Sequence, residues 1–354
     1  MPINEKKLDN AMELIEGAIR MKCFPGAVAA VGRCEGIYRM GCYGNRCIYP
    51  DVLPMNIETR FDMASLTKIM ATDTLFMVFM EKGLISVYDR VADYLKCFNG
   101  CGKDEVTMFN LLTHTAGFIP FTDLYNKCSD YEDAIKYICS TDLQYKPGSK
   151  VVYSDFSFIL LGYILEKIGG DRLGKLCKKY IFDPLGMTHT SFNPAGENIA
   201  ATEIDNKTGK PLIGTVHDEN ARFFGGISGH AGLFSNIKDA AKFANMFING
   251  GRVGDVSFLS PVTVDAMTRN YTRDLGESRG LGWCIKGDKI SSSGDIINPS
   301  AFGHTGFTGT SMWIDRINDI YIILLTNRVH PTRENAGILR FRRLFHNAVL
   351  ASIE

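Results

Sequence analysis

The chain has 354 residues, and its 39 lysines and arginines balance its 39 aspartates and glutamates. This balance argues against nucleic acid or an anionic membrane as the main partner, because both attract strongly basic proteins. Hydrophobic residues make up 45% and charged residues 22%, which excludes a disordered chain and predicts a globular protein with a sizeable core.

The sequence begins without a basic segment followed by an apolar run, so we expect no secretory signal. The apolar run at 320–325 has the length of a strand and is far shorter than the roughly 20 residues of a membrane span. Ten cysteines occur, and none forms a C-x-x-C pair. We therefore expect reduced thiols and a cytoplasmic location.

The first part of the chain predicts a helix, two strands and a second helix. Apolar residues at helical spacing predict a helix over 8–21, which Pro25 and Gly26 end. Strand-like runs follow at 27–32 and 37–43. A long, largely buried helix is then predicted over 66–81.

The rest of the chain is mostly helical until its last quarter. Helices are predicted over 156–168 and 240–248, each ended by a pair of glycines. Strand patterns return later and are followed by a closing helix; they lie at 281–286, 310–315 and 320–326, with the helix at 334–353.

This order of elements predicts a mixed α/β fold. Strands gather at both ends of the chain and helices lie between them, so the economical arrangement is one sheet built from both ends with helices flanking it. We expect residues 1–82 and 266–354 to form this α/β domain and residues 83–265 to form a mostly helical lobe. Together they would make one catalytic unit.

Ser65-Leu66-Thr67-Lys68, at the start of the second predicted helix, is the sharpest local feature. A serine there lies beside free backbone N–H groups and the positive end of the helix dipole, which suit a developing oxyanion. Lys68 lies one turn later on the same face, within reach of the serine hydroxyl. Alone, S-x-x-K usually marks a capping serine and a solvated lysine, but the apolar neighbours favour a buried lysine here.

Two further groups follow in the chain. Tyr153-Ser154-Asp155 directly precedes the helix predicted at 156–168, and His304-Thr305-Gly306 lies at a late strand before Phe307. In this order, the three groups resemble the active site of the penicillin-binding and β-lactamase-like serine hydrolases. The resemblance covers nearly the whole chain and includes 111–117 and 160–162.

The class C-type branch of this family is the most similar, with its D-alanyl-D-alanine carboxypeptidases, β-lactamases and related esterases. Residues 216–218 and 229–235 resemble most the carboxypeptidases of the penicillin-binding protein 4B type. The resemblance implies a β-lactamase/transpeptidase-like fold, with an antiparallel sheet flanked by helices, an all-helical lobe, and the active site between them.

The resemblance also implies roles for the motif residues. Ser65 would be the nucleophile that forms an acyl-enzyme, and Lys68 and Tyr153 would share the general-base work. The sequence leaves open which of the two holds the proton at rest. The backbone N–H groups of Ser65 and Phe307 would form the oxyanion hole, and His304, Thr305 and Gly306 would face the substrate.

Two residues depart from the family pattern. Asp155 stands where asparagine is usual, so the position keeps an acceptor and loses a donor. We expect Asp155 to hold Lys68 more firmly charged and to grip an acylamido side chain less well. His304 stands where lysine is common, which reduces the attraction for a substrate carboxylate at pH 7.

We expect no catalytic role for the other histidines. We expect His114 to be structural, His230 to pack in a tight glycine-flanked turn, and His189, His330 and His346 to lie on the surface. His217 and Asp218 are candidates for lining the cleft. No spacing typical of a catalytic metal, a phosphate-binding loop or a G-x-S-x-G elbow occurs, so we expect no cofactor and no metal.

The sequence therefore predicts a serine hydrolase that acts on D-alanyl peptides or related amides and esters and also binds penicillin. An esterase or a class C-like β-lactamase remains an alternative. A penicillin-binding sensor or scaffold without turnover is an alternative of another class. The partner would be a small molecule or peptide with an acyl group, β-lactams included, and the oligomeric state is open.

Overall fold

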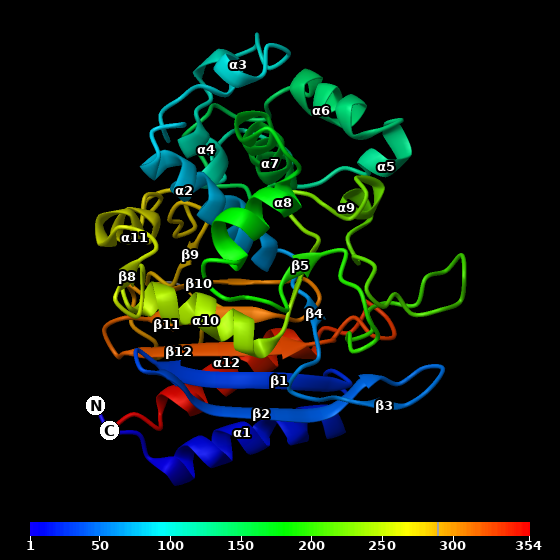
Figure 1. The fold of residues 1–354 in the computed structure, drawn as a ribbon, viewed down its shortest axis with the longest axis vertical. Coiled ribbons are helices and arrows are strands. Elements are labelled where there is room, and N and C mark those ends of the chain that lie inside the picture. Colours follow the sequence, from blue (N-terminus) through cyan, green and yellow to red (C-terminus); the bar gives the residue numbers. More distant parts are fainter. Residues whose placement is uncertain (289) are drawn as a thin grey trace.

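A seven-stranded antiparallel sheet forms one half of the molecule in the computed structural model, which describes residues 1–288 and 290–354 (Figure 1). Its strand order is β3-β2-β1-β12-β11-β10-β9. The strands are β1 (Gly26–Arg33), β2 (Gly36–Cys47), β3 (Leu53–Pro54), β9 (Cys284–Ile285), β10 (Phe302–Thr305), β11 (Ser311–Asp315) and β12 (Ile320–Thr326). Strand β1 pairs with β12, so both ends of the chain build the sheet, as predicted.

Two helices cover the outer face of the sheet. They are α1 (Glu5–Arg20) and α12 (Gly337–Leu350), and they pack against each other as well as against the strands. Helix α1 begins three residues before the prediction because the Asn4 side chain accepts a hydrogen bond from the Lys7 N–H and caps it. Buried Leu8, Ile15 and Phe345 join Trp313 of β11 in one apolar cluster.

Helix α10 (Ile237–Ile248) lies on the inner face of the sheet, against β1, β12 and β11. It falls within the stretch 83–265 that the sequence assigned to the helical lobe, yet it packs on the sheet, because eight of its nine buried side chains are apolar and need an apolar surface on that side. One large core continues from this face into the lobe. The domain boundaries themselves stay a prediction.

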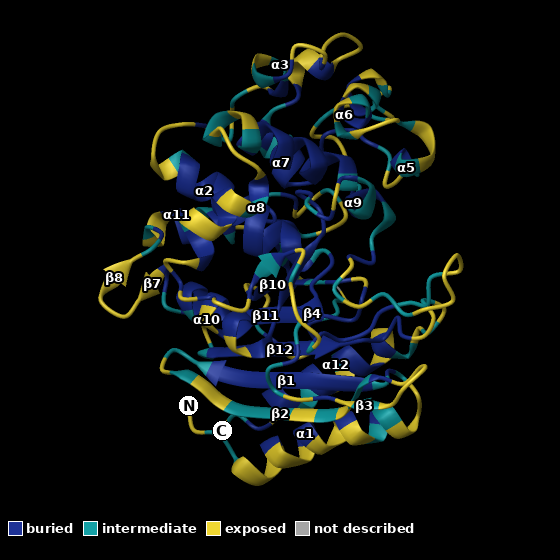
Figure 2. Ribbon diagram, turned by 45° about the vertical axis from the view of Figure 1, so that its right-hand side comes forward, coloured by how far each residue is buried: buried dark blue, intermediate teal, exposed yellow. Residues whose placement is uncertain are grey.

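The helical lobe lies on the side of the sheet away from α1 and α12 (Figure 1). Its central helix, α7 (Asp155–Gly169), is buried from Phe156 to Leu165, and Figure 2 shows it as a dark core among more exposed helices. Further short helices lie in the middle of the sequence. They are α3 (Val91–Tyr94), η2 (Lys103–Glu105), α4 (Met108–Leu112), α5 (Leu124–Lys127), α6 (Tyr131–Ser140), α8 (Leu173–Cys177), η3 (Lys178–Phe182), α9 (Glu219–Phe223) and α11 (Pro261–Met267).

Two small sheets complete the architecture. Strand β6 (Leu233–Ser235) lies between β4 (Phe61–Asp62) and β5 (Ser191–Phe192) and joins the region before the first motif to the lobe. A hairpin of β7 (Arg252–Val253) and β8 (Val256–Ser257) projects from the surface.

The helix predicted over 66–81 is present, with an unexpected first part. Residues Lys68–Asp73 form η1, a π-helical stretch, and α2 (Thr74–Glu81) continues it. Every residue of η1 is buried. Such wide turns are rare and often occur at functional sites, and here the turn carries Lys68 into the molecule.

Two predictions about histidines are wrong. His330 and His346 are buried, at 1% and 0% exposure, and do not lie on the surface. The Nδ1 atom of His346 bonds the Ser292 carbonyl at 2.9 Å, and that of His330 bonds the Thr202 carbonyl at 2.8 Å. These backbone partners allow a polar ring to be buried. His189 is exposed, as expected.

The strand predicted over 281–286 is reduced to Cys284–Ile285. Gly282 has a φ of +76° and its N–H donates to the Leu112 carbonyl, so the chain bends there before it joins the sheet. All ten cysteines are free thiols. Within the described ranges, no helix is both long and apolar enough to span a membrane.

Candidate active site

Ser65 lies at the beginning of the η1–α2 helix, where a strained turn presents it. Ala64 has a φ of +46°, which is unfavourable for a residue with a Cβ atom. The Asp62 carboxylate accepts a hydrogen bond from the Ala64 N–H at 2.8 Å and holds this turn. Ser65 opens into a cleft of about 770 Å³, which residues from the sheet, the lobe and α12 line together.

Lys68 has no solvent exposure, and its ammonium group has three acceptors. Its Nζ atom lies 3.1 Å from Ser65 Oγ, 2.8 Å from Asp155 Oδ1 and 3.1 Å from the His230 carbonyl oxygen. Burial acts to lower the pKa of Lys68, but the negative charge of Asp155, together with the contact with Tyr153, outweighs it and raises the pKa. Lys68 therefore rests as a cation, the direction expected from Asp155.

Tyr153 comes from the loop before α7 and faces Lys68. The centre of its ring lies 4.8 Å from Lys68 Nζ, and its hydroxyl oxygen is buried without a hydrogen-bond partner among the described residues. Burial raises the pKa of Tyr153, although the Lys68 charge opposes this. The phenol thus keeps its proton at rest, close to the lysine and the serine.

The ring of His114 lies against the ring of Tyr153. Its ring centre lies 4.5 Å from that of Tyr153, and its Nδ1 atom accepts a hydrogen bond from the Ser154 N–H. Its backbone is left-handed, with a φ of +57°. Because the ring is 1% exposed and does not line the cleft, the structure places it where a structural histidine was expected.

The third motif closes the cleft at the end of β10. A Cβ atom on Gly306 would lie 2.1 Å from Thr310 Oγ1 and 2.6 Å from the Met63 carbonyl oxygen, so only glycine fits this approach to the Ser65 turn. Thr305 and Phe307 both line the cleft, and Phe307 is half exposed. The backbone N–H groups of Ser65 and Phe307 have no acceptor in the part of the chain that the structure describes, as an oxyanion hole requires.

His304 is a neutral member of this motif. It is 3% exposed, and burial together with the charges of Arg279 and Lys68 lowers its pKa to about 3. Its Nδ1 atom bonds the Thr305 carbonyl, which leaves Nε2 buried and without a partner among the described groups. His304 therefore supplies no positive charge for a substrate at neutral pH.

A buried hydrogen-bond chain beside Lys68 escaped prediction. His230 does not merely pack in a turn: its carbonyl accepts from Lys68, and its ring bonds Asp218 Oδ1 at 2.9 Å and Ser228 Oγ at 2.8 Å. Burial acts to raise the pKa of Asp218, but the His230 ring outweighs it and holds the pKa well below its usual value. No signal in the sequence joined these residues to Lys68.

His217 and Asp218 both line the cleft, where they were candidates. The ring of His217 lies 5.7 Å from that of Phe307, nearly parallel to it, and its Nε2 atom bonds Glu203 at 3.1 Å. Asp218 also caps α9, because it accepts a hydrogen bond from the Ala221 N–H. These two residues form the wall that faces the third motif.

The side chains of Asp155, Asp218 and His230 offer ligand atoms that all lie within 4.8 Å of one another. Such a group could hold a metal ion, but here its charges are already compensated. Lys68 bonds Asp155, and His230 bonds Asp218. We therefore interpret the group as the support of the Lys68 ammonium.

Four arginines that no sequence motif points to also line the cleft. They are Arg279, Arg328, Arg333 and Arg342. Arg279 lies with its guanidinium 5.2 Å from the centre of the Tyr153 ring and pairs with Glu277 at 2.7 Å. Arginines are too frequent for sequence alone to show which of them reach a site.

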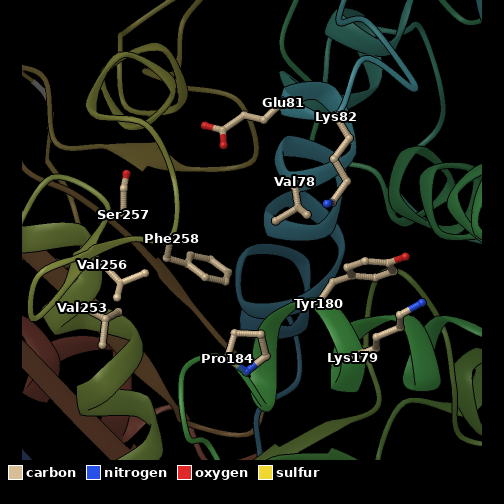
Figure 3. A pocket seen from close by; sticks show the side chains of 10 residues that line it. All are labelled: Val78, Glu81, Lys82, Lys179, Tyr180, Pro184, Val253, Val256, Ser257 and Phe258. Atoms are coloured by element: carbon tan, nitrogen blue, oxygen red, sulfur yellow. The ribbon is translucent and has the colours of Figure 1, made fainter.

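A second hollow, of about 530 Å³, lies elsewhere on the molecule, between the end of α2, η3 and the β7–β8 hairpin (Figure 3). Its floor is apolar, with Val78, Pro184 and Phe258, and Lys82 and Lys179 lie near Tyr180. Its lining has no nucleophile paired with a base. The chemistry therefore points to the cleft at Ser65.

Comparison with known proteins shows the family of the chain. The family described as "Beta-lactamase" matches residues 11–347. A protein of Escherichia coli K12 named "Putative D-alanyl-D-alanine carboxypeptidase" is 36% identical over 304 residues, 77% of this chain and 70% of its own length. A protein of the same name from Salmonella newport is 36% identical over 313 residues, covering 79% and 72%.

Solved structures share the fold at low identity. EstCE1, described as a hydrolase with promiscuous acyltransferase activity, has a TM-score of 0.79 at 20% identity, covering 97% of this chain and 98% of its own. A penicillin-binding protein homologue from Caulobacter crescentus has a TM-score of 0.79 at 19% identity, covering 99% of both chains. The octameric homologue from Pyrococcus abyssi has 0.76 at 22%, covering 97% and 77%.

Proposed function

The chain belongs to the β-lactamase family, and from this premise we propose that it is a serine hydrolase that forms an acyl-enzyme at Ser65 and acts on D-alanyl peptides or related amides and esters. The observation that carries the proposal is the hydrogen bond of 3.1 Å between Lys68 Nζ and Ser65 Oγ, beside the buried hydroxyl of Tyr153. A nucleophile and its proton acceptor have to lie this close. The relatives named as carboxypeptidases support the choice of substrate.

The reaction begins when Ser65 Oγ attacks the acyl carbon and loses its proton. Lys68 and Tyr153 both hold protons at rest, because the pKa of each is raised. One of them must first be deprotonated before it can accept the serine proton and return it to the leaving group. The free N–H groups of Ser65 and Phe307 stabilise the oxyanion, and water later attacks the acyl-enzyme with the same groups as base.

Ester hydrolysis is the second candidate, and Asp155 favours it. The carboxylate of Asp155 is an acceptor engaged with Lys68, so it offers no donor to the acylamido side chain of a peptide or β-lactam. EstCE1, which shares the fold, is described as a hydrolase with promiscuous acyltransferase activity.

We also propose that β-lactams bind at Ser65, with or without turnover. We further propose that the protein is located in the cytoplasm.

Labelling with a fluorescent penicillin tests the nucleophile. We expect a stable or transient adduct on the native protein, no adduct on Ser65→Ala, and a normal adduct on the matched control Ser129→Ala, whose serine is exposed and lies outside the cleft and away from all three motifs in the sequence. An adduct that persists on Ser65→Ala would contradict the assignment of the nucleophile.

Turnover of three substrates then separates the functional classes. A D-alanyl-D-alanine peptide, a chromogenic cephalosporin and p-nitrophenyl acetate report carboxypeptidase, β-lactamase and esterase activity. Hydrolysis of the peptide supports the leading proposal, and hydrolysis of the ester alone supports the second. An adduct without turnover of any of them would indicate a sensor or scaffold.

A further inference from the structure

The surroundings of Tyr153 include a cation that lies outside the three motifs. The guanidinium carbon of Arg279 lies over the ring of Tyr153, 5.2 Å from its centre, and Lys68 Nζ lies 4.8 Å from the same centre. Arg279 is 7% exposed and lines the cleft. Two cations therefore face a phenol whose hydroxyl oxygen is buried without a hydrogen-bond partner among the described residues.

The Arg279 guanidinium is held in place from two directions. Its Nε and Nη2 atoms donate to Glu277 Oε2 at 3.1 and 2.7 Å, and its Nη1 atom donates to Cys284 Sγ at 2.9 Å. The backbone is fixed as well, because the Arg279 N–H donates to Thr272 Oγ1 at 2.8 Å. A guanidinium held in this way needs no rearrangement to stabilise a charge that develops on Tyr153.

The partners of Arg279 offset its charge only in part. The Glu277 side chain is 54% exposed and that of Arg279 only 8%, so water screens the carboxylate more strongly than the guanidinium. Burial raises the pKa of Cys284, which therefore accepts its hydrogen bond as a neutral thiol. Arginine keeps its proton in proteins, so Arg279 remains a cation at every working pH.

The two histidines around the same ring carry no charge at neutral pH. The ring centres of His114 and His304 lie 4.5 and 5.9 Å from that of Tyr153. Burial lowers the pKa of both, that of His304 to about 3, and the charge of Arg279 adds to the lowering in each case. The positive field of Arg279 thus reaches the rings that surround Tyr153, while the histidine of the third motif supplies no cation.

The other cation at this ring, Lys68, already has an anion beside it. Its ammonium group bonds Asp155 Oδ1 at 2.8 Å. Burial raises the pKa of Tyr153, and the charge of Asp155 acts in the same direction, while Lys68 opposes both. Because Lys68 and Asp155 compensate each other, Arg279 is the cation that can balance a negative charge on Tyr153.

We propose that Arg279 is a positioning residue for proton transfer, whose guanidinium stabilises the phenolate form of Tyr153. Tyr153 first loses its proton to water in the open cleft. The phenolate oxygen then takes the proton of Ser65 as Ser65 Oγ attacks the acyl carbon, and the phenol returns this proton to the leaving group. The inference rests on the proposed function, because it assigns a proton acceptor of the same reaction.

A fluorinated tyrosine reports the charge at position 153 without any substrate. In 3,5-difluorotyrosine the fluorine atoms withdraw electrons from the ring, so the phenol ionises at lower pH and fluorine NMR follows this one residue. We expect Arg279→Gln to move its titration to higher pH by about 1–3 units, the range for an opposite charge nearby. Arg279→Lys, which retains the charge, should move it less. Arg273→Gln, an exposed position in the same segment, should leave it unchanged.

The rate of acylation shows whether this charge serves the reaction. We expect Arg279→Gln to slow the labelling of Ser65 by fluorescent penicillin at pH 7 by about 10-fold or more, the factor for one unit of pKa. Difluorotyrosine at position 153 should restore part of this rate, because its phenolate forms more easily without the cation. A merely structural loss would not be rescued in this way.

The two measurements separate the inference from the proposed function. A shifted titration in a protein that forms no adduct and hydrolyses no substrate would support the action of Arg279 on Tyr153 and contradict the hydrolase. A titration that Arg279→Gln leaves in place, or slow labelling that the fluorinated residue does not restore, would overturn the inference. Arg279→Met, which fills similar space without a charge, repeats both measurements where the glutamine variant fails to fold.

Discussion

Lys68 is a fully buried cation whose three acceptors come from separate segments: the start of its own helix, the first residue of α7 and the turn before β6. Removal of a general base typically costs 10²–10⁴ in rate. We expect Lys68→Ala to slow acylation of Ser65 by about this factor, measured as the labelling rate with fluorescent penicillin. A labelling rate near that of the native protein would show that the lysine has another role.

Asp155 controls the charge state of Lys68, so its substitution should change the pH dependence. The pKa of Lys68 is raised in the native protein, which leaves little of the neutral base at pH 7 and makes acylation faster as pH increases. Asp155→Asn removes the negative charge and should move this rise to lower pH. It should also improve β-lactam turnover by restoring an amide donor. Rate profiles from pH 6 to 10 test the shift, and an unchanged or lower turnover would count against it.

Asp218 and His230 act on Lys68 through the His230 backbone. Asp218→Asn removes a charge and leaves the His230 ring with a weaker partner, which should cost about 1–3 kcal/mol. We expect a slower acylation with an altered pH profile, while Asp171→Asn, an exposed position in the lobe, should behave like the native protein. A profile identical to the native one would mean that Asp218 only caps α9.

The residues of the site divide into those that the sequence could identify and those that it could not. Ser65, Lys68, Tyr153 and His304 belong to short motifs whose order and spacing are specific. Three other residues reach the cleft only through the tertiary fold. His230 lies more than 70 residues from the nearest motif, and Arg328 and Arg342 lie after the last motif in the sequence. A single arginine or a glycine-flanked histidine has no local pattern that reveals such a position.

At the scale of elements, the segment before β6 lies directly on the backbone of α7. A Cβ atom on Gly229 would lie 2.0 Å from the Phe158 carbonyl oxygen, and one on Gly162 would lie 2.9 Å from Gly229. Neither residue has a positive φ, so the requirement for glycine is steric. This contact aims the His230 carbonyl at Lys68.

Gly229→Ala should therefore push this segment away from α7. Overpacking of this kind costs about 1–3 kcal/mol, and we expect a lower urea midpoint together with slower acylation. The control is Gly17→Ala on α1, where the added Cβ meets only the tip of Arg20 at 3.9 Å. That change should raise stability by roughly 0.5–1 kcal/mol, because alanine is the better helix former. A loss of stability without a loss of activity in Gly229→Ala would contradict the positioning role.

The regular elements were largely predictable because their hydrophobic periodicity is strong. Helices α1, α7, α10 and α12 and the strands β1, β2, β11 and β12 all lie where the pattern placed them, with ends that differ by a few residues. The π-helical η1 was not predictable, since its apolar pattern fits an ordinary helix equally well. Its residues are all buried, so burial does not distinguish the wide turn from an ordinary one either.

At the scale of the whole molecule, several buried histidines should make stability depend on pH. Burial lowers the pKa of His304 to about 3 and that of His346 to about 4, and it also lowers the pKa of His330, from an ordinary value of 6.5. Below pH 6.5 the unfolded chain therefore binds more protons than the folded one, and the free energy of unfolding falls as pH decreases to about 4.

We expect the urea midpoint to decrease steadily between pH 6.5 and 4.5. His346→Asn should flatten this decrease, because it removes one of the groups that titrate on unfolding. A midpoint that is constant over this range would contradict the burial of neutral histidines. His189→Asn, at an exposed position, should leave the slope unchanged.

The pairing of β1 with β12 also has a consequence for biosynthesis. Strand β1 is buried along seven of its eight residues, but its partner β12 begins only at Ile320, when about nine-tenths of the chain has been made. At roughly 5–20 residues per second, the ribosome needs about 15–60 seconds between the two strands. During that delay the nascent β1–β2 hairpin exposes the unpaired edge of a buried strand, so a chaperone that holds this edge would decide the yield of native protein in the cell.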